Sequence, residues 1–230
     1  MTYAIPVFQK ITVLFISLLA GFISKKSKII NRDTTKSLSA FLAYVTNTCL
    51  YVCILQVDYD ADKLKKAAQV FILSIIIHSL TAIFSHIIFK RVKNSKQRVV
   101  YEFALMYDNC GYMGFPLILS MSSVFGQDGL FYGVIYASVF NLFCWSHGIC
   151  LMNSSNENKS KLNWKKIFLN PGMLSILIGL SLFLLKIKIP GLLYEGLTLV
   201  GDMTFPLAMI IIGSLLADID LLHVFKEYNI

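Results

Sequence analysis

Apolar residues occur along this chain in blocks separated by short polar and basic segments. An α-helix rises about 1.5 Å per residue, so a block of about 20 residues spans the hydrocarbon core of a bilayer. Seven such spans can be drawn, at residues 7–23, 37–57, 68–89, 99–122, 129–152, 171–185 and 192–217. The pattern predicts an all-α membrane protein of about seven transmembrane helices.

The composition supports this interpretation. Hydrophobic residues make up 56% of the chain and charged residues 15%, with a mean hydropathy of +0.67, whereas soluble domains carry about a quarter charged residues. The five cysteines lie inside apolar blocks without metal-ligand spacing, so we expect packing roles for them and neither a metal nor a cofactor. No catalytic motif is present, which argues against an enzyme.

The net charge of +8 does not indicate a nucleic-acid partner, because the basic residues lie in the short connections between spans. The first, third and fifth connections hold fourteen lysines and arginines, and the second, fourth and sixth hold five. Cytoplasmic loops carry the excess of Lys and Arg. We therefore predict a protein of the cytoplasmic membrane with its N-terminus outside and its C-terminus in the cytoplasm.

Five polar side chains from four spans fall near the middle of the bilayer, roughly 15–17 Å deep. They are Asn47, Asp108, Asn109, Asn141 and Asp202. Each alone can be an interhelical hydrogen bond, and for Asn141 this alternative stays open. Polar groups at this depth are costly and mark substrate or ion pathways. Their coincidence predicts a shared midplane site.

Two of these spans also carry helix-breaking residues. In the fourth span, Gly111 and Gly114 weaken the helix, and Pro116 cannot donate to the carbonyl of Tyr112. In the seventh, Pro206 leaves another carbonyl without its partner. A helix that restarts after Gly111 exposes N–H groups and the positive end of its dipole, which favours an anion such as a carboxylate.

Other titratable residues in the spans have simpler explanations. His78 lies near mid-span and is a candidate proton relay, with a packing role as the alternative. Glu102 and Glu195 lie near span ends, where a carboxylate reaches the interface.

Three tyrosines are candidates to line a pocket for a small organic ligand. They are Tyr44, Tyr107 and Tyr112, and packing in the core or at the interface is an equally good explanation for each.

The run NCGYMGFPL at 109–117 resembles the fourth-helix motif of the auxin efflux carrier family, which groups plant PIN-type carriers with bacterial malate or malonate permease-like proteins. Supporting matches are FNLFCW at 140–145, Asn170-Pro171, and PLA at 206–208 followed by Gly213. The resemblance covers essentially the whole chain.

This resemblance implies a ten-helix fold of two inverted five-helix repeats, and residues 37–57 do align faintly with 195–215. Residues 1–152 would form the first repeat, with helices one and two in a scaffold and helices three to five in a transport half. Residues 153–170 would form a cytoplasmic loop and the start of the next helix, and 171–230 the first two helices of an incomplete second repeat. The family also implies a homodimer through the scaffold.

Two departures from the family pattern bear on function. Thr48 stands where the family usually has proline, so we expect no proline break in the second span. The chain also stops after the seventh span, so helices eight to ten would be missing. We expect either a truncated product or fragment, inactive alone, or a second chain that supplies the rest.

The predicted function is secondary transport of a small organic anion across the membrane. The resemblance assigns carboxylate binding to Asn109, and we add Gly111, Tyr112, Pro116, Asn47 and Asn141 as substrate-binding candidates. Asp108, Asp202 and His78 are candidates for coupling to a proton or Na⁺. The alternative is a seven-helix membrane sensor that binds without transporting.

Overall fold

The computed structural model describes residues 4–126, 128–154 and 169–219, and every regular element in these ranges is a helix. The connection predicted at 153–170 lies largely outside the described residues, as does the chain beyond residue 219. Five helical spans are long and apolar enough to cross a membrane, and a sixth, shorter apolar helix accompanies them. The all-α membrane fold predicted from the apolar pattern is thus confirmed.

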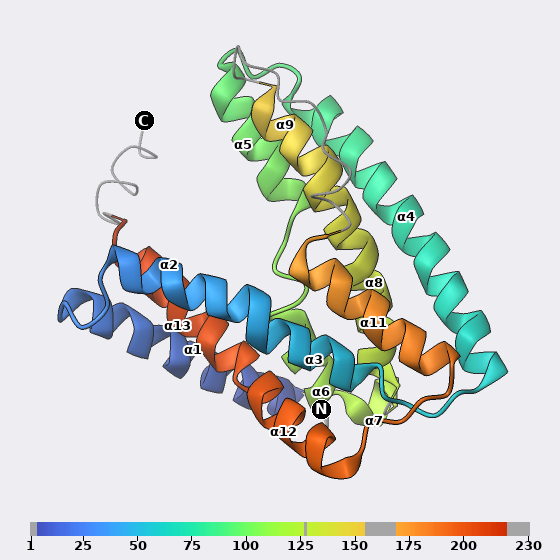
Figure 1. The fold of residues 1–230 in the computed structure, drawn as a ribbon. Coiled ribbons are helices and arrows are strands. Elements are labelled where there is room, and N and C mark those ends of the chain that lie inside the picture. Colours follow the sequence, from blue (N-terminus) through green and yellow to red (C-terminus); the bar gives the residue numbers. More distant parts are fainter. Residues whose placement is uncertain (1–3, 127, 155–168, 220–230) are drawn as a thin grey trace.

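The spans begin and end close to the predicted positions (Figure 1). The first is α1 (Ala4–Lys26) and the third is α4 (Ala61–Phe89). The second comprises α2 (Arg32–Phe41), the π-helix η1 (Leu42–Thr46) and α3 (Asn47–Ile54). The fifth comprises α8 (Gly129–Phe143), the π-helix η2 (Cys144–Gly148) and α9 (Ile149–Asn153). The sixth is α11 (Pro171–Leu184), and the seventh is α12 (Gly191–Asp202) followed by α13 (Thr204–Leu216).

The fourth span is broken, as its glycines and proline predict. It consists of α5 (Ser95–Met106), a non-helical stretch, α6 (Gly114–Ser120) and the short α7 (Ser122–Phe125). The seventh span is interrupted at Met203, because Pro206 has no N–H for the carbonyl of Asp202. The second span carries Thr48 instead of proline, yet it is irregular too, through the π-helix just before Asn47.

Polar caps fix where several helices begin. The side-chain oxygens of Asn31, Asp60, Asn94 and Asn170 each accept a backbone N–H two or three residues further on. Such a cap contributes about 1 kcal/mol by satisfying a donor that the first helical turn leaves free. Asn170 is followed by Pro171 at the first helical position, where a missing N–H does no harm.

The helices pack in two groups that are visible in Figure 1. In the first group α1 lies along α13, and α3 lies between α11 and α12. In the second group α4 packs against α5 and α8, and α5 also contacts α9. The lower half of the broken span, α6, contacts both α1 and α8, so it bridges the two groups.

Glycines allow unusually close helix contacts in the first group. A Cβ atom on Gly21 of α1 would overlap the backbone carbonyl of Ile210 in α13. A Cβ atom on Gly213 would likewise overlap the carbonyl of Leu18. Small residues at such crossings let two backbones touch, which is how helices associate strongly where no hydrophobic effect drives them together. The first and seventh spans are therefore closely packed, backbone against backbone.

Polar contacts tie the connection after the second span to the one before the seventh. Nζ of Lys188 lies 2.9 Å from Oδ1 of Asp58 and 3.2 Å from the carbonyl oxygen of Gln56. The backbone N–H of Ile189 donates to Oε1 of Gln56 at 3.0 Å. The hydrogen bond and the charge of Lys188 lower the pKa of the Asp58 carboxyl below its ordinary value. The ion pair is therefore lost as the pH falls through that lowered pKa.

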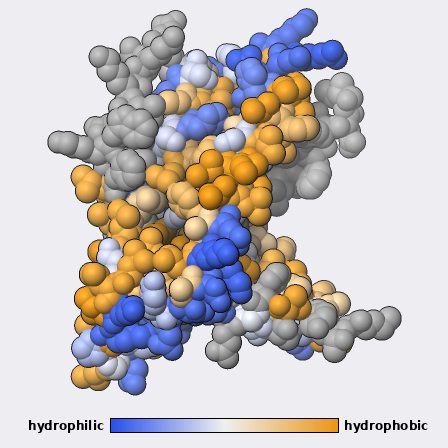
Figure 2. Space-filling model, turned by 90° about the vertical axis from the view of Figure 1, so that its right-hand side faces the viewer, coloured by the Kyte–Doolittle hydropathy of each residue, from blue (hydrophilic) through white to orange (hydrophobic). Residues whose placement is uncertain are grey.

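The outer surface of the helices is strongly apolar. Hydrophobic side chains cover much of the face in Figure 2, with hydrophilic groups towards its top and bottom and one group between them. The third span illustrates the pattern, since many large apolar residues along α4 are exposed. Exposed apolar area on this scale is expected for a surface that contacts lipid acyl chains.

A matched pair of glycine substitutions tests the helix crossing. Gly213→Ala should destabilise the protein by roughly 1–3 kcal/mol, because the new methyl group meets the backbone of α1 and the helices must separate. Gly196→Ala in α12 meets no atom within 4 Å and should be neutral or stabilising, since alanine favours helix. Thermal unfolding in one detergent compares them, and equal melting temperatures would contradict the close crossing.

Candidate functional site

The break in the fourth span lies between Met106 and Gly114. The helix stops at Tyr107, whose backbone adopts φ −115° and ψ 78°. Asn109 follows in the unwound stretch. Helical bonding resumes where the N–H of Met113 donates to the carbonyl of Asn109 at 3.4 Å, and the N–H of Phe115 then donates to the carbonyl of Gly111 at 3.1 Å. Pro116 is fully buried one turn later. The predicted break is confirmed, and it exposes backbone polar groups in the middle of a span.

A tyrosine hydroxyl from the second span lies beside this break. The hydroxyl of Tyr51 is 4.0 Å from the position that a Cβ atom on Gly111 would occupy. The side-chain amides of Asn47 and Asn141 both face this hydroxyl closely enough to interact with it, and Tyr112 and Cys110 are also within electrostatic range. Three spans therefore direct polar groups to one place at the break.

Asn47 has unused hydrogen-bonding capacity at this place. Its side chain is buried, and within the described residues no donor reaches its Oδ1 atom. A buried acceptor without a partner costs about 1–3 kcal/mol. A ligand or water that offers a donor would recover that energy, so the site is suited to bind a polar molecule.

The start of the sixth span closes the same region. A Cβ atom on Gly172 would be 3.4 Å from Oδ1 of Asn170 and 3.7 Å from Oδ1 of Asn141. Asn170 caps α11, while Nδ2 of Asn141 donates to the carbonyl of Ala137 at 2.9 Å. The small Gly172 thus lets the start of α11 approach the fifth span.

Tyr107 holds the end of the break that follows α5 against the fifth span. Its hydroxyl lies 3.0 Å from the carbonyl oxygen of Phe143 and 3.1 Å from Nδ1 of His147. Gly148 leaves room for the ring, since a Cβ atom there would be 3.1 Å from it. His147 and Gly148 belong to the π-helix η2, and such widened turns are frequent at functional sites.

The residues proposed for the substrate do not all occupy equivalent positions. Asn47, Asn141 and Gly111 lie beside the Tyr51 hydroxyl, and Asn109 is half-buried in the break itself. Tyr112 packs instead against the core between α1, η1 and α13. Pro116 is buried behind the break and shapes the backbone. Tyr44 is 66% exposed on η1 and lines no part of this site.

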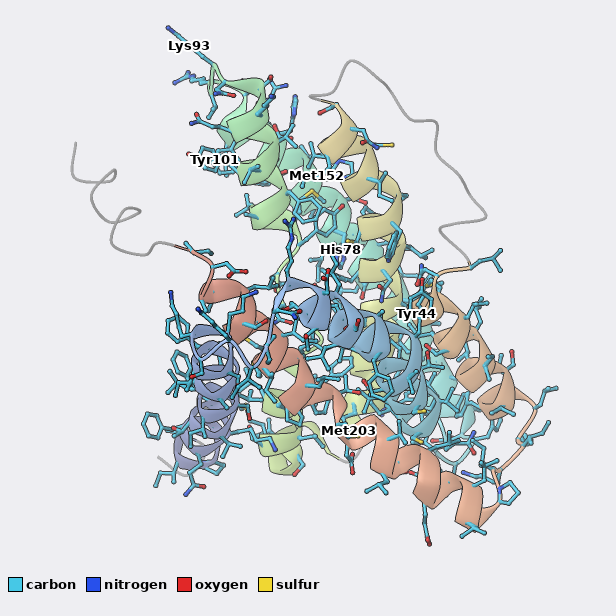
Figure 3. All side chains as sticks on the ribbon, turned by 60° about the vertical axis from the view of Figure 1, so that its left-hand side comes forward. Tyr44, His78, Lys93, Tyr101, Met152 and Met203 are labelled. Atoms are coloured by element: carbon cyan, nitrogen blue, oxygen red, sulfur yellow. The ribbon has the colours of Figure 1, made fainter. Side chains whose placement is uncertain are left out.

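The coupling candidates lie apart from one another. Asp108 is exposed in the break next to Asn109. Asp202 lines a different cavity of about 280 Å³, which α3, α6, α8, α12 and α13 enclose and which Cys53 also lines. His78 is buried in the second group, where its Nδ1 lies 2.7 Å from the carbonyl oxygen of Ser74 and its ring contacts Tyr136 and Phe143. Figure 3 shows it deep between helices.

Tyr51 and Gly172 carry no motif in the sequence, and Asn170 stands out only in the Asn170-Pro171 match to the family. Tyr51 follows Asn47 by four residues, so the two side chains share one face of the second span, and this spacing is a usable signal. No comparable signal exists for Gly172, because its role depends on the approach of another helix. Glu102 was expected to reach the interface at a span end, but it is only 4% exposed.

Comparison with protein families gave one match. The family described as "Membrane transport protein" matches residues 6–223 of the 230. The search among curated proteins gave no match.

Replacing Tyr51 by phenylalanine tests the centre of the site. Tyr51→Phe keeps the ring, which packs edge-on against Phe115, but removes the hydroxyl that the two asparagines face. We expect a loss of about 0.5–1.5 kcal/mol in stability. Tyr44→Phe, at an exposed position, is the matched control and should leave thermal unfolding unchanged. If both variants melt like the wild type, the Tyr51 hydroxyl has no part in the cluster.

Proposed function

The chain belongs to the family of membrane transport proteins that includes the auxin efflux carriers, and we propose that it is a secondary transporter that moves a small organic anion across the cytoplasmic membrane. The single observation that carries the proposal is the meeting of three polar spans at one helix break. Asn47, Asn141 and the Tyr51 hydroxyl face the unwound backbone at Gly111. Secondary transporters bind their substrates at broken helices of this kind.

The chemistry of the site favours a carboxylate with a hydrogen-bond donor. The amides of Asn47, Asn109 and Asn141 and the hydroxyl of Tyr51 donate hydrogen bonds, and carboxylates accept them strongly. Oδ1 of Asn47 needs a hydrogen-bond donor from the ligand, since it lacks one within the described residues. A hydroxy acid satisfies both demands, because its carboxylate accepts and its hydroxyl donates.

We further propose that the two packed groups are the two parts that move during transport. The first, second, sixth and seventh spans would act as the scaffold, and the third to fifth spans as the transport half. The close contact of α1 with α13 supports a rigid scaffold, and the packing of α4 against α5 and α8 supports a second body. The second body meets the first where α8 contacts α3 and α11. The break would then lie where the two bodies meet.

The orientation proposed from the basic connections places the first connection and the end of the seventh span in the cytoplasm. The salt bridge between Nζ of Lys25 and Oδ2 of Asp218, at 3.1 Å, supports this, because it joins the two segments at one end of the molecule. For a coupling ion, Asp108 is the best-placed candidate, since it is exposed directly beside the substrate residues. Asp202 and His78 remain candidates at a distance from them.

The test is uptake and binding of small carboxylates by the chain in proteoliposomes. Malonate and malate serve as probes, and Asn109→Ala should lower uptake at least tenfold if it removes a hydrogen bond to a charged group, worth about 1.5–3 kcal/mol. Gln97→Ala removes an exposed amide from α5 and is the control; it should leave uptake unchanged. Unchanged uptake by Asn109→Ala would refute its role, and binding without uptake would favour the membrane sensor.

A further inference from the structure

The cavity that Asp202 lines is separate from the break in the fourth span. It has a volume of about 280 Å³, and residues of the unwound stretch do not line it. Its walls come mostly from α3, α12 and α13 of the first helix group, from α8 of the second, and from α6, which bridges the two. A cavity of about 150 Å³ holds a benzene molecule. This larger cavity therefore has room for one ring with a short side chain.

Polar groups of this cavity lie along one face of α12. Tyr194, Thr198 and Asp202 follow one another at intervals of four residues, so their side chains share that face. The hydroxyl of Thr198 donates to Sγ of Cys53 on α3, with the two atoms 3.6 Å apart. Its oxygen keeps lone pairs that accept hydrogen bonds. Thr198 and Asp202 thus present neighbouring acceptors to a ligand in the cavity.

The carboxylate of Asp202 has no cation to balance it among the described residues. Asp202 is the last residue of α12, and Met203, labelled in Figure 3, follows it. It lies roughly 16 Å along the helix from Gly191, deep in the predicted bilayer. None of the salt bridges among the described residues involves it. An ionised side chain at this depth is costly without a partner, and the negative end of the helix dipole adds to its attraction for a cation.

The remaining walls decide which kind of cation fits. Leu50 and Ile54 of α3, Phe131 of α8 and Phe205 of α13 make much of the lining apolar and aromatic. Apolar walls take up hydrocarbon, and aromatic faces attract cations. A hard metal ion requires several oxygen ligands, and the described residues contain no group of three or more His, Cys, Asp or Glu side chains that could hold one. The cavity therefore favours an organic cation over a metal ion.

The cavity extends from the middle of the spans to one of their ends. Gln56 and Val57 line it and follow α3 directly, and Tyr194 lines it in the first turn of α12. Asp202 lies at the opposite end of α12. A ligand in the cavity thus has its positive group furthest from the span ends, next to Asp202, and its apolar part among the rings.

We propose that this cavity is a binding site for a small organic cation, a protonated amine joined to one apolar ring. The ammonium group donates hydrogen bonds to the carboxylate of Asp202 and the hydroxyl oxygen of Thr198, and the ring lies against Phe131 and Phe205. The site is separate from the carboxylate site at the break and has the opposite charge preference. It does not depend on the proposed function, because cation binding is measured without transport.

The test is equilibrium binding of radiolabelled 2-phenylethylamine, a cation at neutral pH, to the chain in phosphatidylcholine nanodiscs. Binding to empty nanodiscs is subtracted, because the amine also partitions into lipid. Unlabelled 2-phenylethanol has nearly the same shape but no charge. We expect saturable binding of the amine, and the alcohol should compete at least roughly tenfold less well, since hydrogen bonds between charged groups are the stronger ones. Binding that does not saturate, or equal competition by the alcohol, would overturn the proposal.

A matched pair of variants on α12 identifies the group that binds the charge. Asp202→Asn keeps the shape of the side chain but removes its charge, and it should weaken binding of the amine at least roughly tenfold. Glu195→Gln removes a carboxylate from an exposed position of the same helix that does not line the cavity, and it should bind the amine like the wild type. Equal affinities of Asp202→Asn and the wild type would refute the site.

Leu119→Trp provides a second test that leaves the carboxylate in place. Leu119 lines the cavity from α6 and is 43% exposed, so a larger side chain there takes up cavity space without disturbing the buried core. The variant should weaken binding of the amine severalfold. Leu105→Trp makes the same change at an exposed position of α5 outside the cavity and should have no effect. Wild-type affinity in Leu119→Trp would show that the amine binds elsewhere.

Discussion

Everything in this fold depends on how the unwound backbone of the fourth span is accommodated. Hydrocarbon offers no water for free N–H and carbonyl groups, so a break in a spanning helix is stable only when protein or a wet cavity surrounds it. Here the second span covers one side of the break and the fifth span covers another. The break requires these neighbours, and their polar side chains make it a binding site.

The helices within each group are held to one another by a different kind of contact. This difference suits two bodies that move relative to each other. In the first group the backbones of α1 and α13 are in direct contact, because Gly21 and Gly213 have no side chain to separate them. In the second, aromatic rings of Phe103, Tyr107, Phe140 and His78 pack among α4, α5 and α8. The first kind of contact resists separation, because two closely packed backbones would lose many van der Waals contacts if the helices moved apart. The second leaves polar groups, such as His78, enclosed between helices.

Widened helical turns have a particular place in this arrangement. Both π-helices lie next to residues that face the break, η1 directly before Asn47 and η2 three residues after Asn141. A π-turn rotates the residues that follow it relative to a regular helix, and it loosens the regular pattern of backbone bonds. The Phe143 carbonyl, directly before η2, accepts a hydrogen bond from the Tyr107 hydroxyl. Irregular helix therefore occurs on several sides of the site, and not only in the broken span.

The sequence alone determined the spans and the break. Span length follows from apolar blocks, and the break from Gly111, Gly114 and Pro116, because both are properties of a short stretch of chain. Counting residues from the span ends also pointed to Asn47 and Asn141, and both side chains lie close to the Tyr51 hydroxyl. The family resemblance from the fourth-span motif was confirmed by the match over residues 6–223.

Only the tertiary structure decided which polar groups share a site. Residue counting gives depth in the bilayer, which is one coordinate, while the position within the membrane plane depends on how each helix tilts and rotates. Asp202 and His78 have suitable depths but face other neighbours, and Glu102 proved buried beside His86 of the third span. Those rotations are set by contacts between distant segments, such as Gly21 with Ile210 and Gly172 with Asn141. No local pattern in the chain encodes them.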